Sequence, residues 1–570
     1  MANADREQTE VLNRETQNVE KSLDFDSILQ QEVGQFGWFQ VRNLLLALIA
    51  VIFLAWSNNA YVFTTGRIST RCHIPECDLE EPEFSPDWLL NAIPGTSHTS
   101  FDNCQRFGNA TAGPLEPGVC PAVWFNQSHL KSCERHLYQN TNTVVYDFNL
   151  ACDEVRRTLI GSIRIFGTLF TQLFTGFISD RWGRRTALVF TAFNGAWLGV
   201  LKYFAYNYVG FIILEFIQAA IGGGTFQCAY ILILEMVGPE NRVLTGAIMN
   251  TGLSIGLVTL SLIAWAVPNW RVLSLVLFTP QLLTISYLWL MGESVRWYIT
   301  KGRYEDCEKS LKNIARVNKR QLSEKSLEFL RRKTENEIQS RKDDTENKKK
   351  EKEPSLIKLL FKYKPVLFRC LTTPFMWITF TLIYQGLTIN AVGISGNKYL
   401  NYMAVASSQI PGFWIANFLL DRLGRKPVLA GAYWICAACQ IGYMFIPKNQ
   451  YALSLAFYLT GSSCSGAMLS ALYIFTAELY PTPYRHRFFA FSSMTGRFGS
   501  VFAPLTPALS VLVWEQFPFA LFAGCACVSG ALVLLAPETR GARLPDTMRQ
   551  AADLGRTRTP RQPTTEFTRI

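Results

Sequence analysis

Charge is scarce in this sequence. Only 17% of its 570 residues are charged, whereas 49% are hydrophobic and 13% aromatic. That is more apolar material than one soluble core needs. Histidine is scarcer still, and all five histidines fall outside the apolar blocks, with His486 at an edge. We therefore expect a membrane protein without a buried histidine proton relay.

Patterns typical of enzymes and of nucleic-acid binding are also missing. No cluster of metal ligands and no nucleophile–base constellation recurs, so the sequence predicts neither an enzyme nor a cofactor. The net charge of +11 could suggest nucleic acid. The basic residues, however, sit in short loops that follow the positive-inside rule, and no basic face of a soluble domain is evident. We expect no nucleic-acid partner.

The first 40 residues lack the layout of a secretory signal. They are polar, without the short charged-then-apolar order and the small-residue cleavage site. We expect the first apolar block to insert uncleaved, which leaves both termini in the cytosol.

Twelve apolar blocks of about 20 residues follow, long enough to cross a hydrocarbon core of roughly 30 Å. They are expected near 43–62, 159–178, 186–206, 209–232, 243–267, 272–291, 366–389, 400–420, 427–447, 452–474, 488–512 and 515–536. The chain then divides into a cytosolic N-terminus (1–42), a six-helix half (43–296) with an extracellular cap (63–155), a cytosolic linker with helices (297–364), a second six-helix half (365–538) and a cytosolic tail (539–570). The linker is highly charged and includes Lys348-Lys349-Lys350.

The cap holds six of the 14 cysteines: Cys72, Cys77, Cys104, Cys120, Cys133 and Cys152. An even set in an external loop predicts up to three disulfides, and the sequence does not choose among the 15 possible pairings. Asn109 and Asn126 begin N-glycosylation sequons in the same loop, which agrees with an external position.

Three landmarks repeat along the chain at nearly one offset. Asp180 and Asp421 begin basic loops 241 residues apart, and Glu235 with Arg242 recurs 243 residues later as Glu478 with Arg485. Glu293-Ser294 is echoed after 245 residues by Glu538-Thr539. These repeats indicate two six-span halves.

Each repeated loop places an acid beside arginines and a turn-making glycine at a cytosolic helix junction. There it could pair with Glu235 or Glu478 as the halves close, and so stabilise one state of a gate. The alternative is positive charge that only sets topology, which explains the arginines but not the fixed Asp and Gly positions. The candidate gating residues are Asp180, Arg181, Gly183, Arg184, Arg185, Glu235, Arg242, Asp421, Arg422, Gly424, Arg425, Glu478 and Arg485.

The run Gly176-Phe177-Ile178-Ser179-Asp180-Arg181-Trp182-Gly183-Arg184-Arg185 resembles the signature of the major facilitator superfamily, and Asp421-Arg422-Leu423-Gly424-Arg425-Lys426 resembles its second-half echo. The six-cysteine loop, Ala477-Glu478-Leu479-Tyr480-Pro481-Thr482, Tyr384-Gln385-Gly386-Leu387 and Leu544-Pro545-Asp546-Thr547 together resemble solute carrier family 22. That family comprises organic cation, organic anion and carnitine-type zwitterion transporters. The resemblance covers about residues 20 to 550.

The resemblance implies an all-α membrane protein with twelve transmembrane helices in two pseudo-symmetric halves. It implies a plasma-membrane carrier that works by alternating access, with a central site opened first to one side and then to the other. The expected partners are the lipid bilayer and a small organic ion, and a homo-oligomer through the extracellular loop is possible.

Arg497 is the most informative candidate for contact with substrate. It lies about ten residues into the eleventh span, near the midplane, where an arginine is costly and needs an explanation. The resemblance implies that cation carriers have aspartate here and that anion or carnitine-like carriers have arginine. A guanidinium would grip a carboxylate. The alternative is a structural arginine paired with an interior carbonyl or acid.

Two departures from the family complicate the charge preference. Gln409 replaces a usual acid of the eighth span, and Phe413 occupies a place where anion carriers often have lysine. Glu215 stands where arginine is usual, and an ion pair with Arg164 would satisfy both side chains as well as any ligand role.

Aromatic and amide side chains complete the candidate site. Trp377 and Tyr384 lie seven apart on one helical face, and Phe226 and Tyr230 lie four apart on another. Lipid contact or packing is an equally good explanation for such aromatics. Buried amides that could orient a ligand are Asn58 and Asn250.

Two other functions compete with organic ion transport. A sugar-type facilitator would share the motif loops, although the six-cysteine cap argues against it. A transport-inactive receptor or scaffold is disfavoured because the gate motifs are intact in both halves.

Overall fold

The computed structural model describes residues 36–98, 100–110, 120–332, 356–447, 449–540 and 547–554, together with 28, 32–34, 335 and 545. The Lys348-Lys349-Lys350 run, most of the N-terminus, Thr111 of the first sequon, Leu544 and Asp546 of the last family motif, and the tail beyond 554 lie outside the described residues.

The first half is built from six spanning units. They are α3 (Trp38–Thr64), α6 (Glu154–Trp182), α7 (Arg184–Leu201) with η3 (Lys202–Phe204), α8 (Tyr208–Gly222) with α9 (Thr225–Met236), α10 (Arg242–Ala266), and α11 (Trp270–Phe278) with η5 (Pro280–Ser286) and α12 (Tyr287–Leu290). Polar caps start several of them: Asp153 accepts a hydrogen bond from the Arg156 N–H, and Asn207 one from the Gly210 N–H.

The second half repeats this plan. Its units are α17 (Lys364–Asn390), α18 (Lys398–Leu423), α19 (Arg425–Phe445), α20 (Tyr451–Leu479), α21 (Arg485–Phe502) with η7 (Ala503–Leu505) and α22 (Thr506–Leu512), and α23 (Phe517–Leu535). At Gly412 and Gly499 an added Cβ would clash with the backbone carbonyls of Ser463 and Ile378. Glycine thus lets helices of this half approach closely, as small residues do in membrane bundles.

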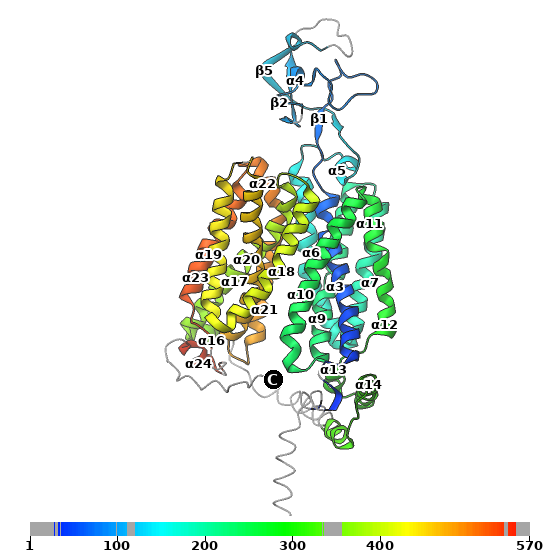
Figure 1. The fold of residues 1–570 in the computed structure, drawn as a ribbon, viewed down its shortest axis with the longest axis vertical. Helices are drawn as coiled ribbons and strands as arrows, with labels where there is room; N and C mark the ends of the chain where they lie inside the picture. Colours follow the sequence, from blue (N-terminus) through cyan, green and yellow to red (C-terminus); the bar gives the residue numbers. More distant parts are fainter. Residues whose placement is uncertain are drawn as a thin grey trace, which may run out of the picture.

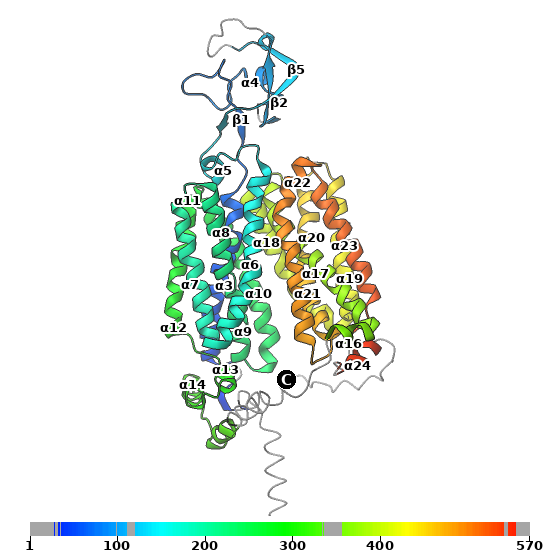
Figure 2. The ribbon, with the colours of Figure 1, turned by 180° about the vertical axis from the view of Figure 1, so that it is seen from behind.

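Ten helices in the described part of the chain are long and apolar enough to span a membrane. The units α6 and α21 are not among them, because α6 carries Arg164 and α21 carries Arg497 in addition to polar ends. Both nevertheless run through the bundle beside the other helices (Figures 1 and 2). The expected fold class is confirmed.

The two halves stand side by side, with the cap above them and the short helices α13 (Val295–Thr300), α14 (Tyr304–Val317), α16 (Leu356–Lys362) and α24 (Met548–Asp553) at the opposite end (Figure 1). Several contacts join the halves on the cap side. Tyr399 stacks on Phe63 and on Trp265 at centroid distances of 5.6 and 5.9 Å, and its carbonyl accepts a hydrogen bond from Ser261 Oγ at 2.9 Å. The ribbons diverge toward the opposite end in both views (Figures 1 and 2).

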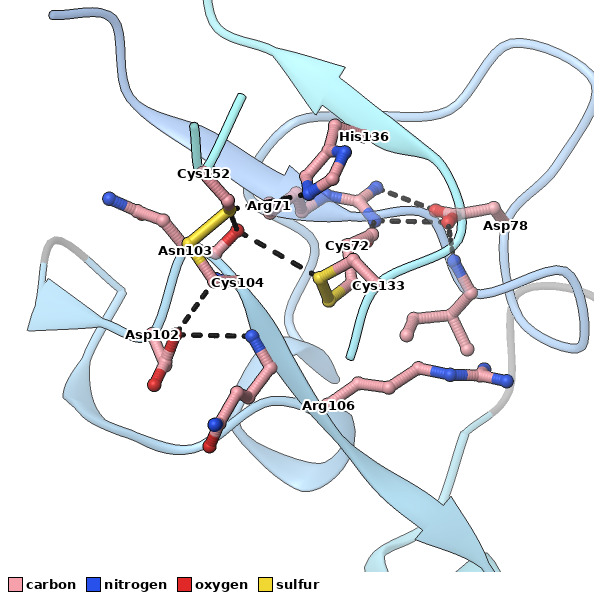
Figure 3. Close-up of a disulfide and its surroundings, with 12 residues drawn as sticks. Arg71, Cys72, Asp78, Asp102, Asn103, Cys104, Arg106, Cys133, His136 and Cys152 are labelled. Carbon is pink, nitrogen blue, oxygen red and sulfur yellow. Dashed lines mark hydrogen bonds and ion pairs between the residues drawn. A yellow bond between two sulfur atoms is a disulfide. The ribbon is translucent and has the colours of Figure 1, made fainter. Parts of the chain in front are cut away.

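The described part of the cap contains three two-stranded antiparallel sheets. Strand β1 (Thr70–Cys72) pairs with β6 (His136–Tyr138), β2 (Gly95–Ser97) with β3 (Ser100–Phe101), and β4 (Gln105–Asn109) with β5 (Phe125–Ser132). One of the 15 possible cysteine pairings is formed: Cys72–Cys133, Cys77–Cys120 and Cys104–Cys152. The first and third bridges lie close together beside strand β1 (Figure 3).

A fully buried ion pair supports the same region. The guanidinium of Arg71 meets both carboxylate oxygens of Asp78, at 2.9 and 2.6 Å, and neither side chain is more than 1% exposed (Figure 3). Near the sequons, Asn109 Nδ2 donates to Glu76 at 2.7 Å, whereas Asn126 Oδ1 accepts from the hydroxyl of Ser128, the third residue of its own sequon. The bidentate ion pair and the three disulfide bridges together compensate for the small apolar core of this domain.

Candidate functional site

A cavity of about 230 Å³ lies between the two halves. Helices α3, α6, α9 and α10 supply one wall, and α17 and α21 supply the other. Its polar lining includes Asn58, Arg164, Gln385 and Arg497, and its aromatic lining consists of Phe226 and Tyr384. A cavity bounded by both halves is the geometry that a central alternating-access site requires.

Arg497 contributes an uncompensated cation to this cavity. None of the described residues that line the cavity carries a carboxylate. Within the part of the chain that the structure describes, Arg497 makes no hydrogen bond or ion pair, and the structural alternative therefore lacks a partner for it. A half-buried guanidinium without an acid attracts anionic groups, and its planar donors match a carboxylate.

The second arginine of the cavity is paired with an acid that it shares with a lysine. Arg164 Nη1 lies 2.6 Å from one carboxylate oxygen of Glu215, and Lys202 Nζ lies 2.6 Å from the other. Arg164 also donates to Gln218 at 2.9 Å, and all three charged side chains are 2% exposed. The expected Arg164–Glu215 pair is confirmed, so Glu215 acts as an internal counterion and does not line the cavity.

Lys202 is the residue that sequence reasoning missed. It ends the third span, where a lysine is expected to reach toward the headgroups. Its position 13 residues before Glu215, across a short turn, is the signal that would have suggested the contact.

Only one of the two aromatics predicted on α17 lines the cavity. Tyr384 does so, and its hydroxyl donates to Gln409 Oε1 at 2.9 Å. Trp377 is 2% exposed and packs against Tyr473 and Phe489, with its indole N–H on the Thr476 hydroxyl. Seven residues keep one helical face but separate two side chains by about 10 Å along the axis, so Trp377 lies beyond the cavity.

The other candidates also separate into cavity walls and supports. Phe226 lines the cavity and Tyr230 stacks on it at 5.5 Å. Gln409 is completely buried behind Tyr384 and donates to the Thr388 hydroxyl, while Phe413 is buried without lining the cavity. Asn250 is half-buried and does not line the cavity either.

The first motif loop is held by three acids. Gly183 has a φ of +109°, and an added Cβ would clash with the carboxylate of Glu293. Glu293 accepts hydrogen bonds from the N–H groups of Arg184 and Arg185 at 2.9 and 3.1 Å. The Arg184 side chain lies 2.6 Å from Asp180 and 3.5 Å from Glu235.

The second motif loop repeats this arrangement. Gly424 has a φ of +108°, and Glu538 accepts from the N–H groups of Arg425 and Lys426, each at 3.0 Å. Arg425 lies 3.4 Å from Asp421 and 3.2 Å from Glu478. Each network therefore ties helices of its own half, whereas the sequence suggested pairs that form as the halves close.

The side chains of the remaining gating candidates make other contacts or are exposed. The guanidinium of Arg422 stacks 4.2 Å from the ring of Phe418, and Arg185 donates to the Met291 carbonyl. Arg485 donates to Thr482 at 3.3 Å, Arg242 makes contacts at the start of α10, and Arg181 lies exposed at the end of α6. No group of three or more metal-binding side chains occurs among the residues described.

Comparison with known proteins agrees with this architecture. The sequence profile of the Major Facilitator Superfamily matches residues 157–504 and 402–566. The chain is 29% identical over 552 residues to solute carrier family 22 member 1 of Oryctolagus cuniculus, covering 94% of this chain and 97% of that protein. It is 27% identical over 548 residues to the organic cation transporter protein of Drosophila melanogaster, covering 95% and 96%.

Solved structures show the same fold at lower sequence identity. The partially occluded inward-open xylose transporter XylE from E. coli gives a TM-score of 0.56 at 15% identity, covering 89% of this chain and all of that chain. A D-xylose–proton symporter gives 0.54 at 14% identity with the same coverage. At these identities the similarity extends to the fold alone.

Proposed function

We propose that this chain, which belongs to the major facilitator superfamily and within it to solute carrier family 22, carries small organic ions across the plasma membrane. It does so by alternating access, and it prefers carboxylate-bearing zwitterions or anions. The cavity between the halves supports a central substrate site. The single observation that carries the charge preference is Arg497, a cation that faces this cavity without a carboxylate partner.

The mechanism follows from the charge of the cavity. Arg164 is held in an ion pair with Glu215, so Arg497 is the side chain available to bind a substrate carboxylate. Phe226 and Tyr384 offer aromatic faces on the two sides of the cavity, against which an organic or quaternary ammonium part can stack. The two motif networks keep the helices of each half together, so that the halves rock as rigid units around the bound ion.

The orientation of the chain also belongs to the proposal. The disulfide-bonded cap lies outside, and the short helices at the opposite end lie in the cytosol (Figure 1). Both termini are then cytosolic. A homo-oligomer through the cap is supported by β5, whose residues after Phe125 are all exposed.

The sugar-type alternative has weaker support. Its structural relatives share only the fold, whereas the solute carrier relatives match along almost the whole chain. Uptake of a neutral hexose would nevertheless favour it, and an absence of uptake for every ion would favour a transport-inactive receptor.

A radiolabelled uptake panel tests the proposal. Carnitine, a hydrophobic carboxylate and a quaternary amine are compared in wild type, Arg497→Lys, Arg497→Gln and Arg497→Asp. We expect Arg497→Gln to lower kcat/KM for the two carboxylates by about tenfold or more, since one charge-assisted contact is lost. Arg497→Lys should retain part of the activity, and Arg497→Asp should shift preference to the amine.

The matched control is Arg487→Gln, which removes an exposed arginine from the cytosolic end of the same helix. This variant should transport all three compounds at wild-type rates. Unchanged carboxylate uptake by Arg497→Asp would disprove the charge preference while leaving ion transport itself intact.

A further inference from the structure

The donors of the Arg164 guanidinium are occupied unevenly. Nη1 donates to Glu215 at 2.6 Å and to Gln218 at 2.9 Å. Gln218 is itself fixed, because its amide donates to the Gly195 carbonyl at 2.7 Å. Among the described residues, Nε and Nη2 reach the backbone and side-chain oxygens of Asn58, both at 3.4 Å, which is long for a hydrogen bond from nitrogen to oxygen. One edge of this arginine is therefore firmly bound and the other weakly.

The weakly bound edge borders the central cavity. Arg164 and Asn58 both line that cavity, and Asn58 is half-buried. Arg497 lines the same cavity from α21, a helix that contacts α6, on which Arg164 lies. The Nε–Nη2 edge of a guanidinium matches the two oxygens of a carboxylate, and such charge-assisted contacts are about twice as strong as neutral ones. A carboxylate that displaces the Asn58 side chain thus exchanges long contacts for stronger ones.

Lys202 determines the net charge that an anion meets at this edge. A pair of Arg164 and Glu215 alone is neutral. Lys202 Nζ lies 2.6 Å from the second carboxylate oxygen of Glu215, so the three side chains together carry one positive charge. The ammonium also lies 5.1 Å from the centroid of the Phe278 ring. Because all three charged side chains are almost fully buried, water and salt screen this extra charge much less than a surface charge.

We propose that Arg164 is a second carboxylate-binding arginine of the cavity, and that Lys202 is the positioning residue that keeps it available. This inference rests on the proposed transport of organic ions and names a further part of the same substrate site. Arg497 remains the cation without an acid partner, and the Nε–Nη2 edge of Arg164 adds a second contact to the substrate carboxylate. Glu215 meanwhile stays on Nη1 and on Lys202.

The two arginines lie in opposite halves of the molecule. Arg164 belongs to α6 of the first half and Arg497 to α21 of the second. A carboxylate that both arginines bind joins the halves across the cavity and cancels part of the repulsion between two cations. Binding therefore favours closure of the cavity around an anion, and an amine without a carboxylate gains nothing from either contact.

The alternative is a purely structural cluster that fastens α6, α8 and the end of the third span to one another. A structural role explains the Arg164–Glu215 pair, because each buried charge needs a partner. It does not explain Lys202, since the pair is already complete and another buried cation costs free energy. A role in attracting anions accounts for this additional charge.

The experiment measures uptake of carnitine, a hydrophobic carboxylate and a quaternary amine by the full chain in proteoliposomes, per amount of folded carrier. Lys202→Met leaves the Arg164–Glu215 pair complete but removes the extra charge. We expect kcat/KM to fall about fivefold or more for the two carboxylates and to stay constant or rise for the amine. Lys202→Arg keeps the charge and should retain most of the carboxylate uptake. The matched control is Lys301→Met, which removes an exposed lysine at the end of α13 and should behave like wild type.

Two further variants separate direct contact from the effect of charge at a distance. Arg164→Lys keeps the positive charge but lacks the planar edge with two donors, so carboxylate kcat/KM should fall about fivefold or more while amine uptake persists. The double variant Lys202→Met with Glu215→Gln removes one charge of each sign. It restores the net charge of wild type and leaves Arg164 without a competing acid, so its carboxylate kcat/KM should equal or exceed that of wild type.

The outcomes distinguish this inference from the proposed function. Wild-type carboxylate uptake with an unchanged carboxylate-to-amine preference in Lys202→Met would overturn the inference alone. An equal loss for all three compounds would do the same, since a purely structural cluster affects every substrate alike. Undiminished carboxylate uptake by Arg164→Lys would disprove the direct contact. If wild type carried no carboxylate at all, the proposed preference for carboxylates would fall as well.

Discussion

At the scale of single residues, the most unusual arrangement is a buried carboxylate shared by two cations. Lys202 and Arg164 each lie 2.6 Å from one oxygen of Glu215, and the three side chains are almost completely shielded from solvent. The sequence predicted the Arg164–Glu215 pair because two opposite charges in spans of the same half can satisfy each other. It missed Lys202 because a lysine at the end of a span normally reaches the membrane surface.

Two conservative substitutions in this triad should have unequal effects on the stability of the protein. Lys202→Met leaves a complete one-to-one pair, whereas Glu215→Gln leaves two buried cations without a counterion, at a cost of about 3–5 kcal/mol. We expect Glu215→Gln to lower the thermal unfolding temperature in detergent much further than Lys202→Met. The double variant should recover part of the loss, and equal losses for the two single variants would contradict the shared-carboxylate arrangement.

The sequence also could not predict how far along its helix each side chain lies from the cavity. Helical periodicity correctly placed Trp377 and Tyr384 on one face, but it could not state which of them reaches the cavity. That depends on where α17 is covered by α20 and α21, which is decided by tertiary packing. The disulfide pairing of the cap was open for the same reason.

At the scale of elements, the two motif loops act as helix junctions. A glycine of positive φ ends one spanning helix, and the next begins with N–H groups that donate to the carboxylate of Glu293 or Glu538. A carboxylate at a helix N-terminus satisfies free N–H groups and interacts favourably with the helix dipole. The sequence repeat identified both glutamates as landmarks, but only the structure assigns them to these junctions.

Two glycines of the first motif provide a matched comparison. Gly183→Ala imposes a strained backbone and a clash with Glu293, whereas Gly176 has nothing within 4 Å of an added Cβ. We expect Gly183→Ala to lower the yield of folded, monodisperse protein strongly. Gly176→Ala should match wild type or be slightly more stable, since alanine is the better helix former by about 1 kcal/mol. Similar size-exclusion profiles for both variants would argue against the junction.

At the scale of the whole molecule, hydrophobic length predicted the helices well. Each expected span corresponds to a helical unit whose ends differ from the expected ones by at most five residues in either direction. Length and hydropathy alone select ten of the units, because α6 and α21 carry arginines that face the interior. Which end of the interface between the halves is closed could not be predicted, since one sequence supports both states of a rocking carrier.

The contacts between the two halves on the cap side offer a way to block their rocking movement. Ser261 and Tyr399 belong to opposite halves and touch through a hydrogen bond. A disulfide between Ser261→Cys and Tyr399→Cys should hold the halves together there and abolish uptake until a reductant is added. The control pair Asn390→Cys and Thr506→Cys joins two contacting residues of the same half, and uptake should persist after its oxidation.

The contacts at the base of the cap join it to the first half. Its chain leaves α3 and returns into α6, and at its base Arg271 of α11 pairs with Asp147 at 2.8 Å while Asn142 accepts from the Trp270 N–H. When the halves rock, we expect this domain to tilt together with the first half as a rigid extension of it. In the proposed orientation, a fluorophore or antibody fragment on the cap would then report each turnover from outside the cell, without any probe entering the bilayer.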